Sequence, residues 1–245
     1  MRIISHDVEG FIKPPNGRWK IFRKVGRFFR YRGIQYLGIW QEKQIKNAYK
    51  PDIYFIQNIF FKGKRKVPQI DLFRSELLEN INVLTPYTQY EEKRFFGLLP
   101  NRVYSIGAFT PYPTRAVQMT KESSMLETSV DDLSIISFNL SKKKKHRREQ
   151  LRFLEGYINH NIHRKFIVIG AFNIKRDSEL FSLTKHCSLY KAPLSATYPV
   201  KKPKHHSTMI LYDNSIMVSA SKTIQDSCSN HLPVVLDCEI RKELR

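Results

Sequence analysis

The chain has 245 residues, of which 41% are hydrophobic, and its 42 Lys and Arg against 22 Asp and Glu give a formal net charge of +20. This composition supplies a sizeable core and excludes an intrinsically disordered chain. No apolar run approaches the roughly 18–20 residues that cross a bilayer, and the first ten residues lack the features of a signal peptide.

Apolar segments rich in β-branched residues, separated by turn residues, predict strands along the whole chain. They lie at residues 2–5, 52–57, 133–140, 165–170, 215–220 and 233–240. Helices are expected in the stretch that ends at Pro51 and in the stretch "KKKKHRREQLRFLEGYINHNI". Strands outnumber helices and the connections are too irregular for a strict βαβ repeat, so the pattern predicts a mixed-sheet α/β sandwich. Nothing marks a cut between domains, and we expect one domain over 1–245.

Residues 17–34 predict a basic amphipathic helix inserted into this domain. Trp19, Phe22, Val25 and Phe29 recur every three or four residues. Either this stripe packs on the sheet and leaves the charges solvated, or the helix binds phosphates or an anionic membrane surface. Its cations are Arg18, Lys20, Arg23, Lys24, Arg27, Arg30 and Arg32. The run Lys142, Lys143, Lys144 and Lys145 is either a solvated charge run or a further part of the same nucleic-acid-binding surface.

The strand at 165–170 is expected to turn sharply at Gly170. Such a turn delivers Ala171 and Asn173 to the carboxyl end of the strand, where α/β proteins place their chemistry. Alanine has no chemistry to offer there, so its presence requires an explanation.

Six segments in chain order provide that explanation, because together they resemble the endonuclease/exonuclease/phosphatase family, which has the deoxyribonuclease I-like fold. They read "RIISHDVEG", "PDIYFIQN", "SIISFNLS", "FIVIGAFN", "NSIMVS" and "SNHLPVV" and span residues 1–240. The corresponding family motifs are S-x-N, P-D-[IV]-[IV]-x-[LF]-Q-E, T-H-L, G-D-F-N, a D-Y-I-x-V-S-like strand and S-D-H-x-P-V. "SATYP" at 195–199 also resembles a Thr-aromatic-Pro segment of the family. The resemblance implies a four-layer α-β-β-α sandwich with two mixed sheets.

The resemblance also implies a mechanism. In the family, the Glu of Q-E, helped by the first Asn, holds a divalent metal against a phosphate oxygen. The Asp and Asn of G-D-F-N orient the attacking water and the phosphate, and two histidines bind the phosphoryl oxygens. The Asp of S-D-H fixes the tautomer of its neighbouring His, as in the hydrolase triads.

This chain departs from the family at most of these positions. Only Asn173 and His231 match the motifs. The departures are Asp7 for Asn, Asn58 for Glu, Asn139 for His, Ala171 for Asp, Asn214 for Asp and Asn230 for Asp. Because Mg²⁺ needs hard carboxylate oxygens, we predict a pseudoenzyme with no catalytic residues, no metal and no cofactor.

Four acids become neutral and one is gained, so the cleft is about three charges more positive than the family pattern. We therefore predict a protein that holds nucleic acid, DNA or RNA, as a binding or structural component, for example within a ribonucleoprotein or other protein assembly. One alternative is a membrane- or protein-docking scaffold anchored by 17–34. Another is a residual metal-dependent phosphodiesterase in which Asp7 recruits Asp213 or Asp237.

The cysteines favour a reducing, intracellular compartment. Cys187, Cys228 and Cys238 form no CxxC pair and are expected to be free thiols. His186, His205 and His206 with Cys187 lack the spacing of a known zinc site, and we expect solvated loop residues there.

Overall fold

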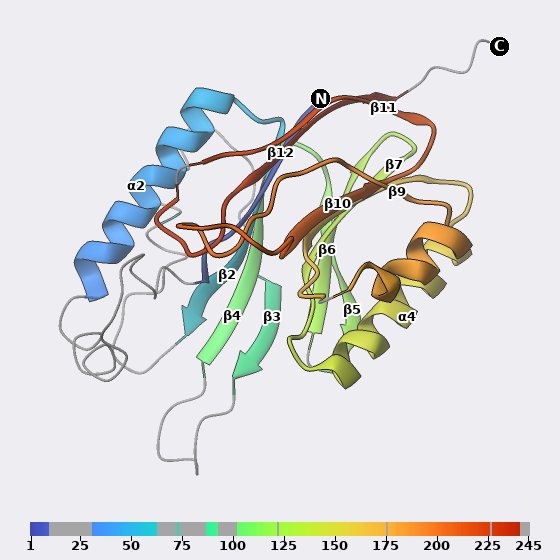
Figure 1. The fold of residues 1–245 in the computed structure, drawn as a ribbon, viewed down its shortest axis with the longest axis horizontal. Coiled ribbons are helices and arrows are strands. Elements are labelled where there is room, and N and C mark those ends of the chain that lie inside the picture. The colour runs from blue at the N-terminus through green and yellow to red at the C-terminus, as the bar shows by residue number, and fades with distance from the viewer. Residues whose placement is uncertain are drawn as a thin grey trace.

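The computed structural model describes residues 1–9, 31–62, 73, 87–92, 102–121, 123–174, 176–225 and 227–240. Two six-stranded sheets pack face to face, with one long helix on the outer face of each (Figure 1). Both sheets mix parallel and antiparallel neighbours. The predicted α-β-β-α sandwich with two mixed sheets is therefore confirmed.

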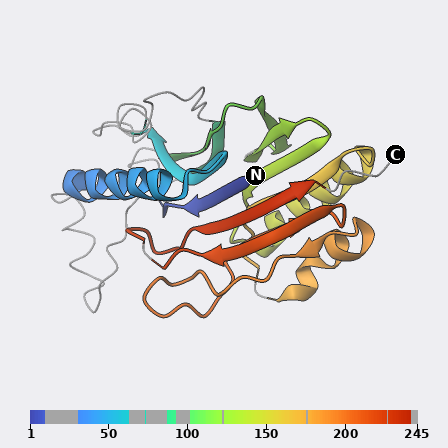
Figure 2. The same cartoon turned by 90° about the horizontal axis from the view of Figure 1, so that it is seen from above.

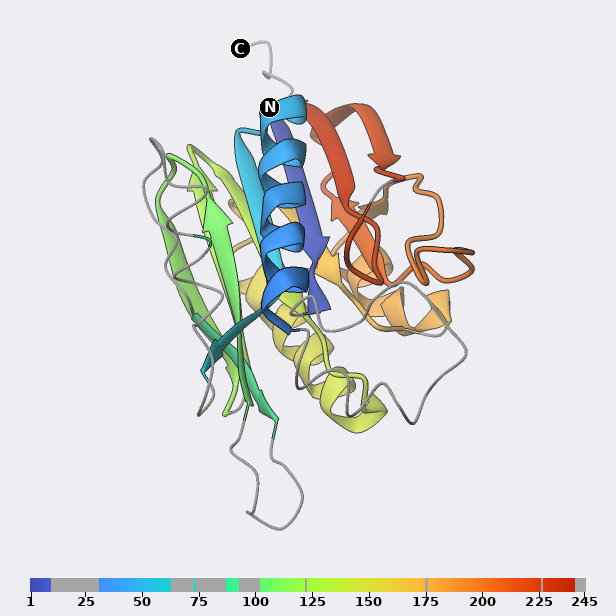
Figure 3. The same ribbon diagram turned by 90° about the vertical axis from the view of Figure 1, so that its left-hand side faces the viewer.

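The first sheet has the strand order β11-β12-β1-β2-β4-β3. Its central pair, β1 (Arg2–Asp7) and β2 (Ile53–Lys62), is parallel and is joined through α2 (Tyr31–Tyr49), which lies along the outer face of the sheet (Figure 3). Figure 2 shows β12 and β11 beside β1. The other strands are β3 (Tyr87–Glu92), β4 (Arg102–Phe109), β11 (Ile216–Thr223) and β12 (Val234–Ile240).

The second sheet has the order β5-β6-β7-β8-β10-β9. Its parallel pair, β7 (Leu133–Asn139) and β8 (Lys165–Ala171), is joined by α4 (Lys144–His160). The two short helices η3 (Asp177–Leu180) and η4 (Ser182–His186) follow β8 and lie beside α4 (Figure 1). The remaining strands are β5 (Thr114–Thr120), β6 (Ser123–Val130), β9 (Tyr190–Lys191) and β10 (Thr208–Tyr212).

Alternation along the strands divides the core into three layers. Ile3 and Phe55 face the second sheet and meet Ile167, whereas Ile4 and Tyr54 face α2. On the other side of the sandwich, buried aromatic and aliphatic side chains of β7 and β8 pack under α4. Odd-numbered positions of β1, β7 and β8 thus face the gap between the sheets, and the residues that end these strands share that direction.

The six predicted strands are present, as are the helices predicted before Pro51 and in the stretch that begins at Lys142, but the described residues contain six further strands that were missed. β5 mixes polar and apolar residues and only one of its side chains is buried, and β10 is a run of five residues that follows a long basic loop. The basic helix predicted at 17–34 falls largely on residues 10–30, which lie outside the described residues; the described helix α2 begins at Tyr31. Of its predicted binding residues only Arg32 lies within α2, and its side chain is not described.

The chain does not turn at Gly170, contrary to the prediction from sequence. β8 continues through Gly170 to Ala171, and the backbone reverses at Asn173, where φ is 51°. Gly170 has a φ of +155°, and a Cβ atom there would overlap the carbonyl oxygen of Phe138 on β7. Glycine at this position therefore permits the close pairing of β7 and β8 at their carboxyl ends.

Candidate active site

The carboxyl ends of the two parallel strand pairs meet at one end of the sandwich. Gln57 on β2 joins the sheets there, because its Nε2 donates to Ser5 Oγ on β1 at 2.6 Å and to Ser137 Oγ on β7 at 2.9 Å. One step further along the strands, Asn139 pairs in register with Ala171. Residues that follow these strands are thereby gathered at the position where α/β folds bind ligands.

Asn58 enters this site through a break in the register of β2. The pairing of β2 with β4 shifts between Ile56 and Ile59, and Asn58 has a φ of 58°. Such a bulge re-aims a side chain, and asparagine tolerates the left-handed backbone better than most residues. The amide Nδ2 of Asn58 donates to Asp7 Oδ1 at 2.6 Å. The amide that replaces the family's metal-binding Glu is thus hydrogen-bonded to the chain's own carboxylate.

Asp7 is almost fully buried at the end of β1. Besides the bond from Asn58, its Oδ1 accepts the backbone N–H of Glu9 at 2.9 Å, and its main-chain oxygen accepts Ser229 Oγ at 2.6 Å. Its Oδ2 lies 3.8 Å from His231 Nε2. The hydrogen bonds to Oδ1 and to the main-chain oxygen of Asp7 therefore join the end of β1 to Asn58, Glu9 and Ser229.

Glu9 is a second carboxylate of the site, and sequence reasoning missed it. Its Oε1 lies 3.4 Å from His231 Nε2 and 3.5 Å from Lys142 Nζ. Burial lowers the pKa of Lys142, but the attraction of Glu9 and Asp7 outweighs it, so the pKa lies above its ordinary value. The ammonium of Lys142 thus stays charged at the edge of the site. The only signal in the sequence was an acidic residue four positions after the end of the strand predicted at 2–5.

Asn139, Ala171 and Asn173 close the site on the side of the second sheet. Asn173 Nδ2 donates to Asn139 Oδ1 at 2.8 Å and to the carbonyl oxygen of Leu140 at 2.7 Å. Ala171 is fully buried and lies on the same side of β8 as Ile169, which faces the gap between the sheets. The position of the family's Asp therefore presents only a methyl group to the site.

His231 is held by packing and by its backbone. Ser229 Oγ accepts the His231 N–H at 3.2 Å, and the Tyr198 ring lies 4.7 Å from the imidazole at an interplanar angle of 31°. Among the described residues neither ring nitrogen has a hydrogen-bond partner, although the side chain is almost fully buried. Asn230 is half-buried, and its carbonyl accepts the Val200 N–H at 3.0 Å. The imidazole thus lacks the hydrogen-bonded carboxylate that orients the corresponding His in the family.

The buried pair of His6 and Glu42 is hydrogen-bonded to the backbone of His231. His6 Nδ1 bonds to Glu42 Oε1 on α2 at 2.8 Å, and Glu42 also accepts the hydroxyl of Tyr54. Burial lowers the pKa of His6, but Glu42, the His231 carbonyl and Asp7 together outweigh it, so the pKa lies above its ordinary value. Its Nε2 donates to the His231 carbonyl at 3.0 Å and lies 2.9 Å from Ser227 Oγ. Because Nε2 donates to a carbonyl, it carries a hydrogen and cannot accept the proton of Ser227, so His6 is a structural link between α2 and the loop that carries His231.

Asn214 does not belong to the site, contrary to the prediction. The Asp213 N–H donates to the Phe166 carbonyl, which places both residues at the amino end of β8, away from Ala171. Asp237 likewise lies at the start of β1, bonded to Arg2 at 2.6 Å. Neither Asp213 nor Asp237 is a partner for Asp7.

The residue that β10 contributes to the site is Thr208, because it pairs with Ala171. Thr208 is fully buried, and its Oγ1 has no hydrogen-bond partner among the described residues. Its backbone N–H donates to Thr197 Oγ1 at 3.1 Å, which gives the "SATYP" segment its local role. The sequence assigned the family's acidic position to the next strand because β10 was not predicted.

Of the residues weighed as a zinc site, His186 makes a side-chain hydrogen bond to another group and His205 pairs through its backbone. His186 Nδ1 bonds to Glu155 Oε1 at 2.7 Å, and His205 pairs with Tyr198. In the part of the chain that the structure describes, no group of three His, Cys, Asp or Glu side chains is arranged to hold a metal ion. None of the three cysteines is disulfide-bonded, as expected.

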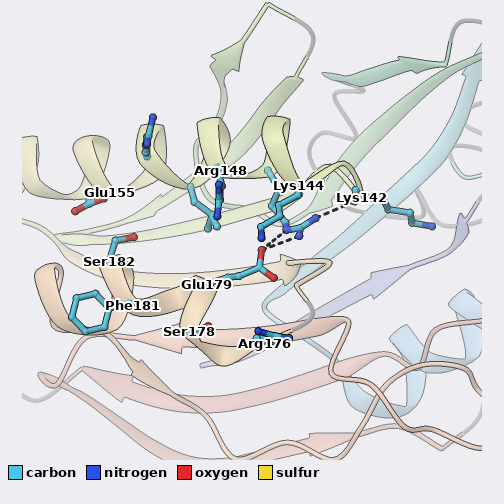
Figure 4. A pocket seen from close by; sticks show the side chains of 12 residues that line it. Lys142, Lys144, Arg148, Glu155, Arg176, Ser178, Glu179, Phe181 and Ser182 are labelled. Carbon is cyan, nitrogen blue, oxygen red and sulfur yellow. Dashed lines mark hydrogen bonds and ion pairs between the residues drawn. The ribbon is translucent and has the colours of Figure 1, made fainter.

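The predicted run Lys142–Lys145 leads into α4, which begins at Lys144, and all four side chains are exposed. Two of these lysines line a groove of about 870 Å³ between α4 and the η3–η4 segment (Figure 4). Arginines that the sequence did not single out line the same groove. No helix in the described ranges combines the length and apolarity needed to cross a membrane.

Comparison with solved structures identifies the fold. An endonuclease/exonuclease/phosphatase from Beutenbergia cavernae aligns with a TM-score of 0.71 at 13% identity, covering 98% of this chain and 71% of that one. The chain has the endonuclease/exonuclease/phosphatase fold. A mannosyl-6-phosphatase from Bacteroides thetaiotaomicron aligns with a TM-score of 0.69 at 12% identity, covering 98% and 100% of the two chains. D. rerio TDP2, complexed with a single-strand DNA product, aligns at 0.60 and 11% identity, covering 98% of each chain.

At the level of sequence, no family model matches the chain. No curated protein matches it either. The fold is thus shared with phosphatases and nucleases, and the chemistry of this site has to be judged from its own residues.

The residues present do not fit the divalent metal that the family resemblance implies. Mg²⁺ requires an octahedron of hard oxygen ligands. Here Asp7 Oδ1 accepts two N–H donors, Asn58 directs an N–H rather than an oxygen at Asp7, and Ala171 offers no ligand. The remaining carboxylate, Glu9, lies between His231 and Lys142. These side chains are therefore arranged to hydrogen-bond to one another at the strand ends and not to surround a metal ion.

Proposed function

We propose that this chain is a non-catalytic member of its fold class that binds nucleic acid. The observation that carries the proposal is the pair of amide hydrogen bonds at the strand ends, Asn58 to Asp7 and Asn173 to Asn139. In a phosphodiesterase of this fold, these positions supply metal ligands and phosphate contacts. In this chain these side chains are hydrogen-bonded to one another, so they stabilise the strand ends instead of binding a metal or a phosphate.

The histidine that remains also argues against hydrolysis. General acid–base catalysis requires an imidazole in a defined tautomer, and replacement of the orienting Asp in a hydrolase triad costs orders of magnitude in rate. His231 has carboxylates at 3.4 and 3.8 Å but no hydrogen bond to either. Its ring is positioned by Tyr198 instead.

Charge supports nucleic acid as the ligand. A net charge of +20 favours polyanions, and the loss of carboxylates from the site removes repulsion toward phosphate. Lys142 adds a charged ammonium at the edge of the site. The neighbour from D. rerio was solved with single-strand DNA, which supports the same ligand class on this fold.

The proposal is tested by measuring cleavage and binding of labelled single-stranded and duplex oligonucleotides in parallel. We expect binding without hydrolysis in either Mg²⁺ or Mn²⁺. Metal-dependent cleavage that disappears in the His231→Ala variant would overturn the proposal. Binding to anionic vesicles in preference to oligonucleotides, with little dependence on salt, would replace nucleic acid by a membrane surface as the ligand.

A pair of double variants tests the loss of metal ligands directly. We expect the native chain to bind Mg²⁺ no tighter than about 1 mM, or about −4 kcal/mol. Asn58→Glu with Ala171→Asp should tighten binding measurably, because both changes add a carboxylate. The matched control, Asn58→Gln with Ala171→Asn, adds the same bulk without charge and should leave Mg²⁺ binding unchanged. Micromolar Mg²⁺ binding by the native chain would contradict this reading of the site.

A further inference from the structure

The groove between α4 and the η3–η4 segment is separate from the strand-end site except at Lys142, which borders both. It has a volume of about 870 Å³ (Figure 4). Besides Lys142, which is paired with Glu9, the cations that line it are Lys144, Arg147, Arg148, Arg152 and Arg176. The acidic side chains that line it number only two, Glu155 and Glu179. A groove of this composition has a strongly positive potential.

Both acidic side chains are already engaged. Glu179 accepts Arg147 Nη2 at 2.8 Å and Arg147 Nε at 3.1 Å, and Glu155 bonds to His186 at 2.7 Å. Arg147 is buried and also donates to the carbonyls of Ser141 and Lys142, so it fixes the groove wall rather than a ligand. The structure gives Lys144, Arg148, Arg152 and Arg176 no ion-pair partner among the residues that it describes.

The free cations of α4 are regularly spaced. Lys144, Arg148 and Arg152 are four residues apart, which places them in one row with about 6 Å of rise between neighbours. The first turn of α4 contains no acidic residue, so the helix dipole adds to the positive potential at its start. This row matches a linear polyanion whose charges repeat at a similar interval, and Arg176 faces it from the opposite wall (Figure 4).

An exposed aromatic ring completes the groove. Phe181 is 57% exposed and packs edge-on against His186, with 5.5 Å between ring centroids. The face of an exposed ring beside a row of cations is the arrangement that stacks unpaired bases in proteins that bind single strands. A polyanion without bases has no group that would stack on this ring.

We propose that this groove binds single-stranded nucleic acid, with phosphates on Arg148, Arg152 and Arg176 and a base stacked on Phe181. The inference rests on the proposed function and assigns it to one surface and one class of nucleic acid. Lys142 connects the groove to the strand-end site, so a bound strand runs along α4 toward that site.

The first experiment measures the affinity of the full chain for a fluorescent single-stranded oligonucleotide as a function of salt. Arg148→Gln with Arg152→Gln removes two phosphate contacts and should reduce the slope of log K against log salt by about 1.4. The control, Lys50→Gln with Lys222→Gln, removes the same charge from exposed positions far from α4 and should leave the slope unchanged. Equal slopes in the two variants would overturn the assignment to this groove.

The second experiment separates bases from charge. Phe181→Ala should weaken oligonucleotide binding roughly tenfold, and Phe181→Tyr, which keeps a ring, should not. Neither variant should change the affinity for inorganic polyphosphate, which carries charge but no bases. Unchanged oligonucleotide binding in Phe181→Ala would overturn the single-strand assignment while the proposed function stands. Failure of the native chain to bind any oligonucleotide would remove both.

Discussion

Replacement of Gly170 by Ala tests whether the close approach of β7 and β8 holds the strand-end site together. The added methyl group would overlap the carbonyl oxygen of Phe138 and lie 3.1 Å from its carbonyl carbon and amide nitrogen. Gly170 also pairs with Met209 on the other side, so β8 has no free direction in which to move. A φ of +155° costs a non-glycine residue about 1–3 kcal/mol, and forced overpacking costs about 1–3 kcal/mol more.

We therefore expect Gly170→Ala to lower the free energy of unfolding by between about 2 and 6 kcal/mol. The smaller value alone corresponds to a fall in Tm of about 4 °C or more for a chain of this length. Gly156 in the middle of α4 is the matched control, because a Cβ atom there meets nothing within 4 Å. Gly156→Ala should raise stability by about 1 kcal/mol. Thermal and urea unfolding measure both, and a Gly170→Ala variant as stable as the native chain would refute the argument.

Two further predictions concern pH. Burial raises the pKa of Glu127, but hydrogen bonds from Ser134, Tyr157 and Arg115 lower it by more than burial raises it. The pKa in the folded state therefore lies below the ordinary value of about 4.3. The Glu127→Gln variant should lose about 1–3 kcal/mol at neutral pH in urea unfolding, and this difference should vanish as pH falls through the folded pKa. For His6 the sign is opposite, because its pKa is raised in the folded state. The loss of unfolding free energy in a His6→Gln variant should therefore be largest below about pH 6.5 and should shrink as pH rises through the folded pKa. A difference that grows with pH would contradict the ion pair.

Most of the central fold could be predicted from the sequence because buried parallel strands are continuously apolar. "FIVIG" is an example, and "LSIISF" is apolar except for two serines; both are central strands. The hairpin of β5 and β6 escaped because its sequences, "TRAVQMT" and "SSMLETSV", mix polar and apolar residues without a clear alternation, although most of β6 is buried. β10 escaped for a different reason, since only five residues pair and a basic loop precedes them.

The site was predictable only where sequence neighbours determine the geometry. Asp7, Asn58, Asn139 and Ala171 lie within two residues of the ends of predicted strands, and the order of motifs was sufficient to group them. Thr208 depends on the antiparallel register of β10 with β8, which no local pattern specifies. The groove along α4 depends in the same way on where the η3–η4 segment packs, so its arginines could not be grouped from the sequence.

The hydrogen bonds of Gln57 have a consequence for how the two sheets are aligned. Apolar contact between sheets is non-directional and tolerates sliding of one sheet over the other. The bonds from Gln57 to Ser5 and Ser137 are directional, and they join the sheets one residue before Asn58. These hydrogen bonds therefore fix the position of one sheet relative to the other, and with it the relative position of the two halves of the site, whatever ligand the protein binds.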